Sequence, residues 1–270
     1  MRPSVVFLVA LFLPFSGCLA PQDEDSTTFR LATTTSMRDS GLLDVLIEEF
    51  ETMYEVDVEY VAVGTGAALQ LGRSGDVDAL IAHAPQQEME FIEEGFGLER
   101  IPIAYNAFVL LSPVHLEGSV FDAFETVAES EHCFVSRGDN SGTHAKEQAI
   151  WNHLNSTRGL ELVEDSNGAH PSGAWYFSIG QGMGAAINMA HEKECITLSD
   201  RGTALQFQPN IDLQRYEFND HIMDNPYSYM IVSSSNHSTA IHFQDYLQGV
   251  GQSTIANYSI NGDAAFFVYS

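Results

Sequence analysis

The chain has 270 residues, 44% of them hydrophobic, and its 37 Asp and Glu outnumber its 11 Lys and Arg to give a formal net charge of −26. This charge argues against nucleic acid or an anionic membrane surface as a partner, because both would be repelled. It fits a solvated acidic shell, as in a salt-tolerant organism. The length and apolar content suit one large lobe or two smaller ones with sizeable cores.

The first 20 residues are predicted to be a targeting segment. Arg2 supplies a positive start, and the apolar run over residues 5–15 is too short for a membrane span. Phe15-Ser16-Gly17-Cys18 resembles a lipobox, in which Cys18 would become the lipid-bearing first residue; a plain secretory signal or an uncleaved anchor is the alternative. Residues 1–25 are thus expected to be a signal peptide and tether, with the remainder extracytoplasmic and held at the membrane by lipid alone.

Strands and helices are predicted to alternate through the first part of the chain. Hydrophobic periodicity predicts strands over residues 29–32, 56–60 and 78–82, and helices over 42–54, 67–71 and 88–94, with a polar turn over 33–41. Such alternation is typical of an α/β fold with a mainly parallel, doubly wound sheet. Ligands of these sheets bind at the carboxyl ends of the strands.

A second alternating unit follows a long apolar strand over residues 103–111. It is predicted to contain helices over 120–128, 143–154 and 183–191 and strands over 133–135 and 195–198; a return strand over 225–232 and a last helix over 239–247 follow. The strands over residues 103–111 and 225–232 are expected to cross between the two lobes and to form a hinge. We therefore expect residues 26–108 and 229–270 to form lobe I and residues 109–228 to form lobe II.

The segment Ser136-Arg137-Gly138-Asp139-Asn140-Ser141-Gly142-Thr143-His144 is the strongest candidate binding site. It joins a short apolar strand to a helix. The free N–H groups and the dipole at a helix start favour an anion, and the fork of Arg137 can hold two oxygens of an oxyanion. A surface ion pair between Arg137 and Asp139 is the alternative interpretation.

Two loops of the first lobe show a similar pattern. Thr33-Thr34-Thr35-Ser36 follows the first strand and offers four hydroxyls, although threonine runs also occur in ordinary helix caps. Gly64-Thr65-Gly66 lacks the third glycine of a dinucleotide-binding loop, so it is either a plain turn or a third donor loop at the same sheet edge. Two lobes that face one small anion would explain these loops together.

The role of Asp139 distinguishes a site for phosphate from a site for a fully deprotonated oxyanion. A carboxylate beside an anion repels it, so Asp139 is expected to hold Arg137, to cap the next helix, or to accept a proton from a ligand that is still protonated, as phosphate is. A nucleophilic triad of Asp139, Ser141 and His144 is not indicated, because all three lie in one turn and no GxSxG elbow is present. We expect no enzyme activity. His83, which ends a strand toward the cleft, is the one scattered histidine that could approach the ligand.

The three cysteines suggest no metal site, since no CxxC or Cys/His spacing is present. Cys18 belongs to the lipobox. Cys133 and Cys195 each begin a predicted strand of the second lobe. In an oxidising compartment they either form a disulfide or remain two buried thiols, and both readings stay open.

The motifs, taken in order, resemble the tungstate-binding (TupA-like) lipoproteins of ABC importers. The resemblance extends over most of the mature chain and rests on these segments: Thr33-Thr34-Thr35-Ser36 with Asp39-Ser40-Gly41, Val63-Gly64-Thr65-Gly66, Gly75-Asp76-Val77-Asp78, Tyr105-Asn106-Ala107-Phe108-Val109, Ser136-Arg137-Gly138-Asp139, Ser141-Gly142-Thr143-His144, Gly180-Gln181-Gly182-Met183-Gly184, Asp200-Arg201-Gly202-Thr203 and Asn225-Pro226-Tyr227. His83-Ala84-Pro85 and Ala107 depart from the family pattern.

The resemblance implies a two-lobe type II periplasmic-binding-protein fold with the oxyanion between the lobes. It implies capture of tungstate, or of molybdate, for an ABC permease by a monomer that needs no cofactor. The ligand-binding residues carried over are Thr34, Thr35, Ser36, Thr65, Gly66, Ser136, Arg137 and Thr143. A receptor for phosphate or another small anion is the alternative, followed by a secreted hydrolase or a sensor domain on the same fold.

Overall fold

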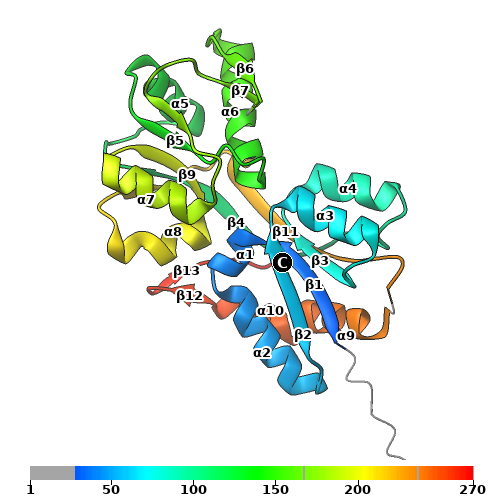
Figure 1. The fold of residues 1–270 in the computed structure, drawn as a ribbon. Helices are drawn as coiled ribbons and strands as arrows, with labels where there is room; N and C mark the ends of the chain where they lie inside the picture. Colours follow the sequence, from blue (N-terminus) through cyan, green and yellow to red (C-terminus); the bar gives the residue numbers. More distant parts are fainter. Residues whose placement is uncertain (1–27, 167, 236, 270) are drawn as a thin grey trace, which may run out of the picture.

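The computed structural model describes residues 28–166, 168–235 and 237–269, so Cys18 and the predicted leader lie outside the described residues. Two lobes share one hydrogen-bonded sheet, whose strand order is β2-β1-β3-β11-β4-β9-β5-β8, with β10 also paired to β4 (Figure 1). Within the described part of the chain, no helix is long and apolar enough to cross a membrane.

The first lobe contains a parallel group of strands with helices between them. Its elements are β1 (Phe29–Thr34), α1 (Thr35–Asp39), α2 (Leu42–Tyr54), β2 (Val58–Val63), α3 (Thr65–Ser74), β3 (Ala79–Ala82), α4 (Pro85–Glu93) and, from the end of the chain, α9 (His237–Gln248), α10 (Val250–Asn257), β12 (Ser259–Ile260) and β13 (Asp263–Ala264). Strands β1, β2 and β3 are parallel to one another, as predicted.

The second lobe repeats the alternation. It contains α5 (Val120–Glu129), β5 (Phe134–Ser136), α6 (Gly142–Arg158), the hairpin β6 (Val163–Asp165) and β7 (Gly168–His170), β8 (Tyr176–Ser178), α7 (Met183–Lys193), β9 (Ile196–Asp200), α8 (Arg201–Phe207) and β10 (Gln214–Tyr216). Strand β5 runs parallel to both β8 and β9. The α/β class and the two-lobe, doubly wound fold expected from the sequence are confirmed.

Strand β4 (Ile101–Ser112) connects the lobes. Its residues up to Ala107 pair with β11 (Asp224–Ile231), and its residues from Phe108 onward pair with β9. One strand therefore changes partners between two successive residues, and the chain returns to the first lobe through β11 (Figure 1). The residue boundaries given above for the two lobes remain a prediction.

Helices cover both faces of the sheet in each lobe, because side chains alternate along the strands. In β1, Leu31 packs with Phe50 of α2 on one face, whereas Ala32 packs with Leu69 of α3 on the other. In β5, Phe134 packs with Trp151 of α6, whereas the next residue faces α7. Because the backbone is buried in this way, the strand ends and the loops after them are fixed in position.

The predicted polar turn over residues 33–41 is wrong in part. Thr33 and Thr34 end β1, and Thr35 begins the short helix α1, which ends at Asp39. The run of hydroxyl residues suggested a turn because such side chains compete for backbone hydrogen bonds. Burial of Met37 against the first core provides the tertiary contact that favours the helix.

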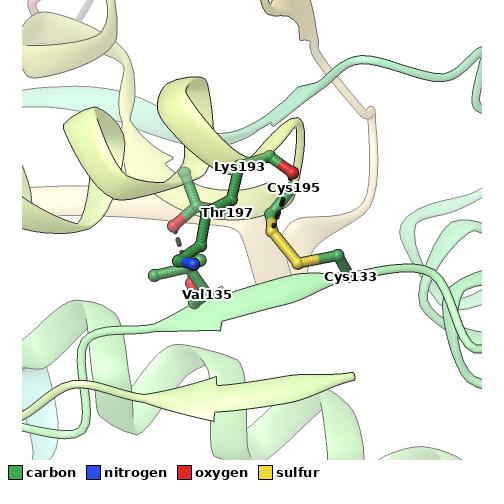
Figure 2. Close-up of a disulfide and its surroundings, with 5 residues drawn as sticks. All are labelled: Cys133, Val135, Lys193, Cys195 and Thr197. Atoms are coloured by element: carbon green, nitrogen blue, oxygen red, sulfur yellow. Dashed lines mark hydrogen bonds between the residues drawn. A yellow bond between two sulfur atoms is a disulfide. The ribbon is translucent and has the colours of Figure 1, made fainter. Parts of the chain in front are cut away.

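A disulfide joins Cys133 and Cys195, the residues just before β5 and β9 (Figure 2). Their Cα atoms are 4.6 Å apart, and the backbone N–H of Ile196 donates to the carbonyl of Cys133. The bond therefore links two neighbouring parallel strands at their amino ends. The carboxyl ends of these strands, where a ligand would bind, lie at the opposite edge of the sheet.

A buried carboxyl group lies in the second-lobe core. Oε1 of Glu147 accepts hydrogen bonds from the Tyr176 hydroxyl (2.6 Å) and from Nε1 of Trp151 (3.2 Å). Burial raises the pKa of Glu147 to about 7, although the Tyr176 and Ser136 hydroxyls act in the opposite direction. The neutral acid is therefore the form that this core accommodates.

Replacement of both Cys133 and Cys195 by Ala should lower the free energy of unfolding by roughly 4 kcal/mol, because the bridge closes a long loop in the unfolded chain. Chemical denaturation of both proteins, with and without reductant, measures the difference. The double variant should not respond to reductant. A non-reducing peptide map in which residues 133 and 195 are not linked would contradict the assignment.

The variant Glu147→Gln should be more stable than the unchanged protein at neutral pH, by about 3 kcal/mol. An unfolded glutamate ionises near its ordinary pKa of 4.5, whereas folded Glu147 ionises near 7. The stability of the unchanged protein is therefore lost progressively as pH rises through this window. Denaturation of both proteins from pH 4.5 to 8 should show a difference that grows to about pH 7 and then levels; a constant difference would contradict the raised pKa.

Candidate functional site

The carboxyl ends of β1 and β2 place two predicted donor loops side by side. Thr34, the last residue of β1, is in register with Val63, the last residue of β2. Helix α1 starts directly after the first strand, and α3 starts two residues after the second. The amino ends of both helices therefore lie at one edge of the sheet, where their unpaired N–H groups can bind an anion.

The hydroxyl run at the start of α1 is largely buried. Thr34 and Ser36 are 2% and 1% exposed, and their hydroxyl oxygens are 3.2 Å apart. Thr35 is half-buried between them. Thr34 is the residue that precedes the helix, yet its side chain makes no capping bond. The Thr34 hydroxyl is therefore not used to cap the helix.

Thr65 presents a buried hydroxyl without a partner. It is the first residue of α3 and 2% exposed, and among the described residues its Oγ1 has no hydrogen-bond partner. A side chain added at Gly64 or Gly66 would meet nothing within 4 Å, so open space adjoins both glycines. A buried unpaired hydroxyl is costly, and it is expected where a ligand supplies the missing partner.

Arg137 follows β5 and is 4% exposed. Asp139 holds one side of its guanidinium: Oδ2 accepts from Nε at 3.1 Å and from Nη2 at 2.5 Å. Nη1 lies 3.5 Å from the hydroxyl of Thr143. The ion pair is therefore buried on the arginine side, unlike a surface pair, and it fixes the direction of the fork.

Both carboxylate oxygens of Asp139 accept hydrogen bonds from the protein, Oδ2 from Arg137 and Oδ1 from its own loop. Its second oxygen, Oδ1, accepts from the backbone N–H of Ser141 at 3.2 Å. The loop is shaped by Gly138, whose φ of +59° suits glycine, and a Cβ there would collide with the side chain of Ser178. Of the three roles considered for Asp139, the geometry provides the first, holding Arg137; the residue that caps α6 is Ser141, and Oδ1 of Asp139 supports the loop before it.

Helix α6 begins immediately after this loop. The Ser141 hydroxyl accepts from the backbone N–H of His144 at 3.3 Å and so caps the helix. Nδ1 of His144 accepts from the backbone N–H of Asn140 at 3.1 Å. The Ser141 hydroxyl and Nδ1 of His144 thus each bind a backbone N–H, and Nε2 of His144 lies 2.9 Å from the amide nitrogen of Gln148.

Ser136 ends β5 with a fully buried hydroxyl, and no hydrogen-bond partner of adequate geometry is present for it. It nevertheless lies close enough to Glu147 to lower the pKa of that carboxyl. Ser136, which was predicted to bind the ligand, therefore lies between Glu147 of the second-lobe core and the loop that carries Arg137.

His83 connects the two lobes, and the predicted ligand set omitted it. Nε2 lies 3.2 Å from the Ser36 hydroxyl, and Nδ1 lies 2.7 Å from Oδ1 of Asn225. A Cβ placed on Gly142, the first residue of α6, would be 3.0 Å from Cε1 of the imidazole. The Ser36 hydroxyl of the first lobe and the start of α6 thus both contact the His83 ring. His83 follows β3, and the sequence had indicated only that it could approach the ligand.

Burial lowers the pKa of His83 to about 4; the hydrogen bond to Asn225 opposes this shift, and the nearby cations Arg137 and Lys146 contribute to it. Arg137 reaches this cluster through Thr143, the residue that follows Gly142. Predicted residues of both lobes are therefore brought together: Thr34, Ser36, Arg137 and Thr143 directly or through His83, and Thr35, Thr65 and Gly66 through the common sheet edge.

An open cavity of about 610 Å³ adjoins this cluster between the lobes. His83, Gly142, Lys146, Phe108 and Pro226 are among its lining residues. It gives the imidazole a route to solvent. Among the described residues, no group of His, Cys, Asp or Glu side chains is arranged to hold a metal ion.

Comparison with known proteins agrees with this architecture. Residues 20–250 match the model of the PBP superfamily domain. A Haloferax volcanii protein, provisionally named an ABC transporter anion-binding protein, is 38% identical over 93% of this chain and 75% of its own length. The tungstate-binding protein TupA of Peptoclostridium acidaminophilum is 34% identical over 94% of this chain and 92% of its own.

A solved structure gives the same assignment. The tungstate ABC transporter protein from Geobacter sulfurreducens superposes with a TM-score of 0.74 at 37% identity, over 86% of this chain and 99% of that one. Binding proteins of ABC importers are not enzymes, and they work outside the cytoplasm. The chain belongs to the periplasmic-binding-protein superfamily and, within it, to the TupA-like family of ABC importer substrate-binding proteins.

Proposed function

We propose that this protein captures tungstate, or the related molybdate, between its lobes and delivers it to the permease of an ABC importer. The observation that carries the proposal is the buried Arg137, which Asp139 holds on one side and whose Nη1 lies beside Thr143. An orphan hydroxyl on Thr65 and the hydroxyls of Thr34 and Ser36 lie at the facing sheet edge.

The donor set suits a fully deprotonated oxyanion. Every group assigned to the ligand can donate a hydrogen bond, and both oxygens of Asp139 already accept hydrogen bonds from Arg137 and from the backbone N–H of Ser141. A protonated phosphate would also need an acceptor for its hydrogen, and the assigned set offers hydroxyl oxygens but no carboxylate for it, so its affinity should be lower. Sulfate, which also carries no proton, would be rejected by a cavity sized for the longer bonds of tungstate.

The energies are sufficient for tight binding. A hydrogen bond to a charged group contributes roughly 1.5–3 kcal/mol net, whereas nanomolar affinity requires about 12 kcal/mol. About five to seven such donors, less the costs of ordering and of closure, would reach it. Closure would also create the surface that the permease recognises.

The cellular setting forms part of the same proposal. Cys18 would carry a lipid that holds the monomer at the outer face of the cytoplasmic membrane. Within residues 1–25, the part before Cys18 would be the cleaved signal peptide, and the part from Cys18 onward would be the tether. Because the protein is strongly acidic, it would repel anions at long range, but salt screens that field beyond about 10 Å at ~0.1 M. Attraction must therefore come from the local donors.

Calorimetric titration of the purified protein with tungstate, molybdate, sulfate and phosphate tests the proposal. Tungstate should bind with a submicromolar dissociation constant and phosphate far more weakly. Arg137→Ala should weaken tungstate binding at least tenfold, about 1.4 kcal/mol, because it removes the only charged donor assigned to the ligand.

The matched control is Arg158→Ala, since Arg158 pairs with Asp122 and Glu125 on the second-lobe surface. It should leave the affinity unchanged. Submicromolar phosphate binding without a response to tungstate would overturn the assignment, and equal affinities of the Arg137 variant and the unchanged protein would remove Arg137 from the site.

Thr65→Val should change affinity and stability in opposite senses. The isosteric change removes a hydroxyl that is unpaired in the empty protein, so unfolding should require the same free energy or more, whereas tungstate affinity should fall by roughly tenfold. Thr197→Val is the control: its hydroxyl donates to the carbonyl of Val135 at 2.8 Å, so stability should fall and affinity should not (Figure 2). A Thr65 variant with lower stability and unchanged affinity would give Thr65 a structural role only.

A further inference from the structure

His83 is held by hydrogen bonds on both ring nitrogens. It directly follows β3, it stacks on Tyr227 with ring centroids 5.0 Å apart, and it adjoins the first residue of α6. One nitrogen contacts a group proposed to bind the ligand, Ser36, and the other contacts Asn225 of β11. The protonation state of the His83 ring therefore determines whether the Ser36 hydroxyl donates a hydrogen bond to it or accepts one from it.

The surrounding network fixes the tautomer. The amide nitrogen of Asn225 donates to Oδ1 of Asn106 at 2.8 Å and to the Tyr227 hydroxyl at 3.1 Å. Its amide oxygen therefore faces His83, and Nδ1 of the imidazole must donate to it. In the neutral ring Nε2 is then an acceptor, so the Ser36 hydroxyl supplies the hydrogen of their 3.2 Å contact.

A hydroxyl has one hydrogen, and here two acceptors require it. In the empty site Ser36 donates to Nε2 of His83. If Ser36 turns its hydrogen toward a bound oxyanion, its lone pairs face the lone pair of Nε2 in a buried site, which is unfavourable. A proton on Nε2 removes the conflict, because the imidazolium then donates to the Ser36 oxygen and attracts the anion.

We propose that His83 takes up a proton from solvent when the site takes up its oxyanion, so that His83 positions the Ser36 hydroxyl toward the ligand. This inference rests on the proposed function of the site. The cavity that His83 lines provides the path for the proton. In chemical terms the ligand is recognised as a dianion together with one proton.

The charges around the ring define the condition for this step. Arg137 and Lys146 oppose protonation, as does burial, and they keep the empty-site ring neutral with a pKa of about 4. Asn225, Tyr227 and Phe108 pack on the ring without charge. Asp224 and His221 line the same cavity. A bound dianion is therefore the charge that shifts the balance, and it must raise the pKa of His83.

Calorimetry of tungstate binding in buffers with different ionisation enthalpies measures the proton uptake directly. The unchanged protein should take up close to one proton per anion near pH 5.5 and little near pH 8. Its affinity should rise by about tenfold over the same range. His83→Gln should bind tungstate with little dependence on pH, because its amide N–H can donate to Ser36 without an added proton.

The variant also serves as the control for other titrating groups. It retains Glu147, whose pKa lies near 7, and it experiences the same protonation of tungstate in solution. NMR titration of the His83 ring in the unchanged protein, with and without tungstate, is a second measurement that does not depend on a variant. It should show a higher pKa in the complex.

Equal proton uptake by the two proteins, or an unshifted His83 ring in the complex, would overturn the inference while leaving tungstate binding intact. Absence of any binding heat or saturation by tungstate would instead contradict the proposed function. The two failures are therefore distinguishable in one experiment.

Discussion

The buried pair of Arg137 and Asp139 is the interaction on which the candidate site depends. A guanidinium at the end of β5 could point in many directions, but two hydrogen bonds to one carboxylate oxygen hold its Nε side. The remaining donors then face Thr143 and the start of α6. Since the same carboxylate also accepts from the backbone of its own loop, one residue fixes both the cation and the helix start beside it.

This arrangement explains how a protein with a formal charge of −26 can hold an anion. Apart from a few buried acids such as Glu147, the described negative residues lie at least partly exposed, where salt screens them. The donors proposed for the ligand are neutral N–H and O–H groups and one arginine, most of them buried. Hydrogen bonds strengthen in such a low-dielectric site, so local geometry outweighs net charge.

The polar atoms that lack partners are informative for the same reason. A folded protein satisfies nearly all of its buried polar groups. Here the hydroxyls of Thr65 and Ser136 remain unpaired next to the loops that carry Arg137 and Ser36. His83 adds a further constraint, because it draws on the hydrogen of Ser36 until an anion competes for it. These polar atoms are therefore the ones for which a bound oxyanion would supply hydrogen-bond partners.

The sequence by itself determined the fold class, the order of most strands and helices, and the loops that hold the hydroxyls and Arg137. These follow from hydrophobic periodicity and from short motifs, which are local properties of the chain. It did not reveal α1, since the helix over Thr35–Asp39 depends on burial of Met37. It also missed the short helices α8 and α10, the second of which follows the helix predicted to be the last, and the strands β6, β7, β8, β10, β12 and β13, which are too brief to show a period. Only the tertiary structure decided that Asp139 holds Arg137, that Cys133 meets Cys195, and that His83 bridges the lobes. Each of these depends on how a side chain is directed or on residues far apart in the chain, and no local pattern encodes either.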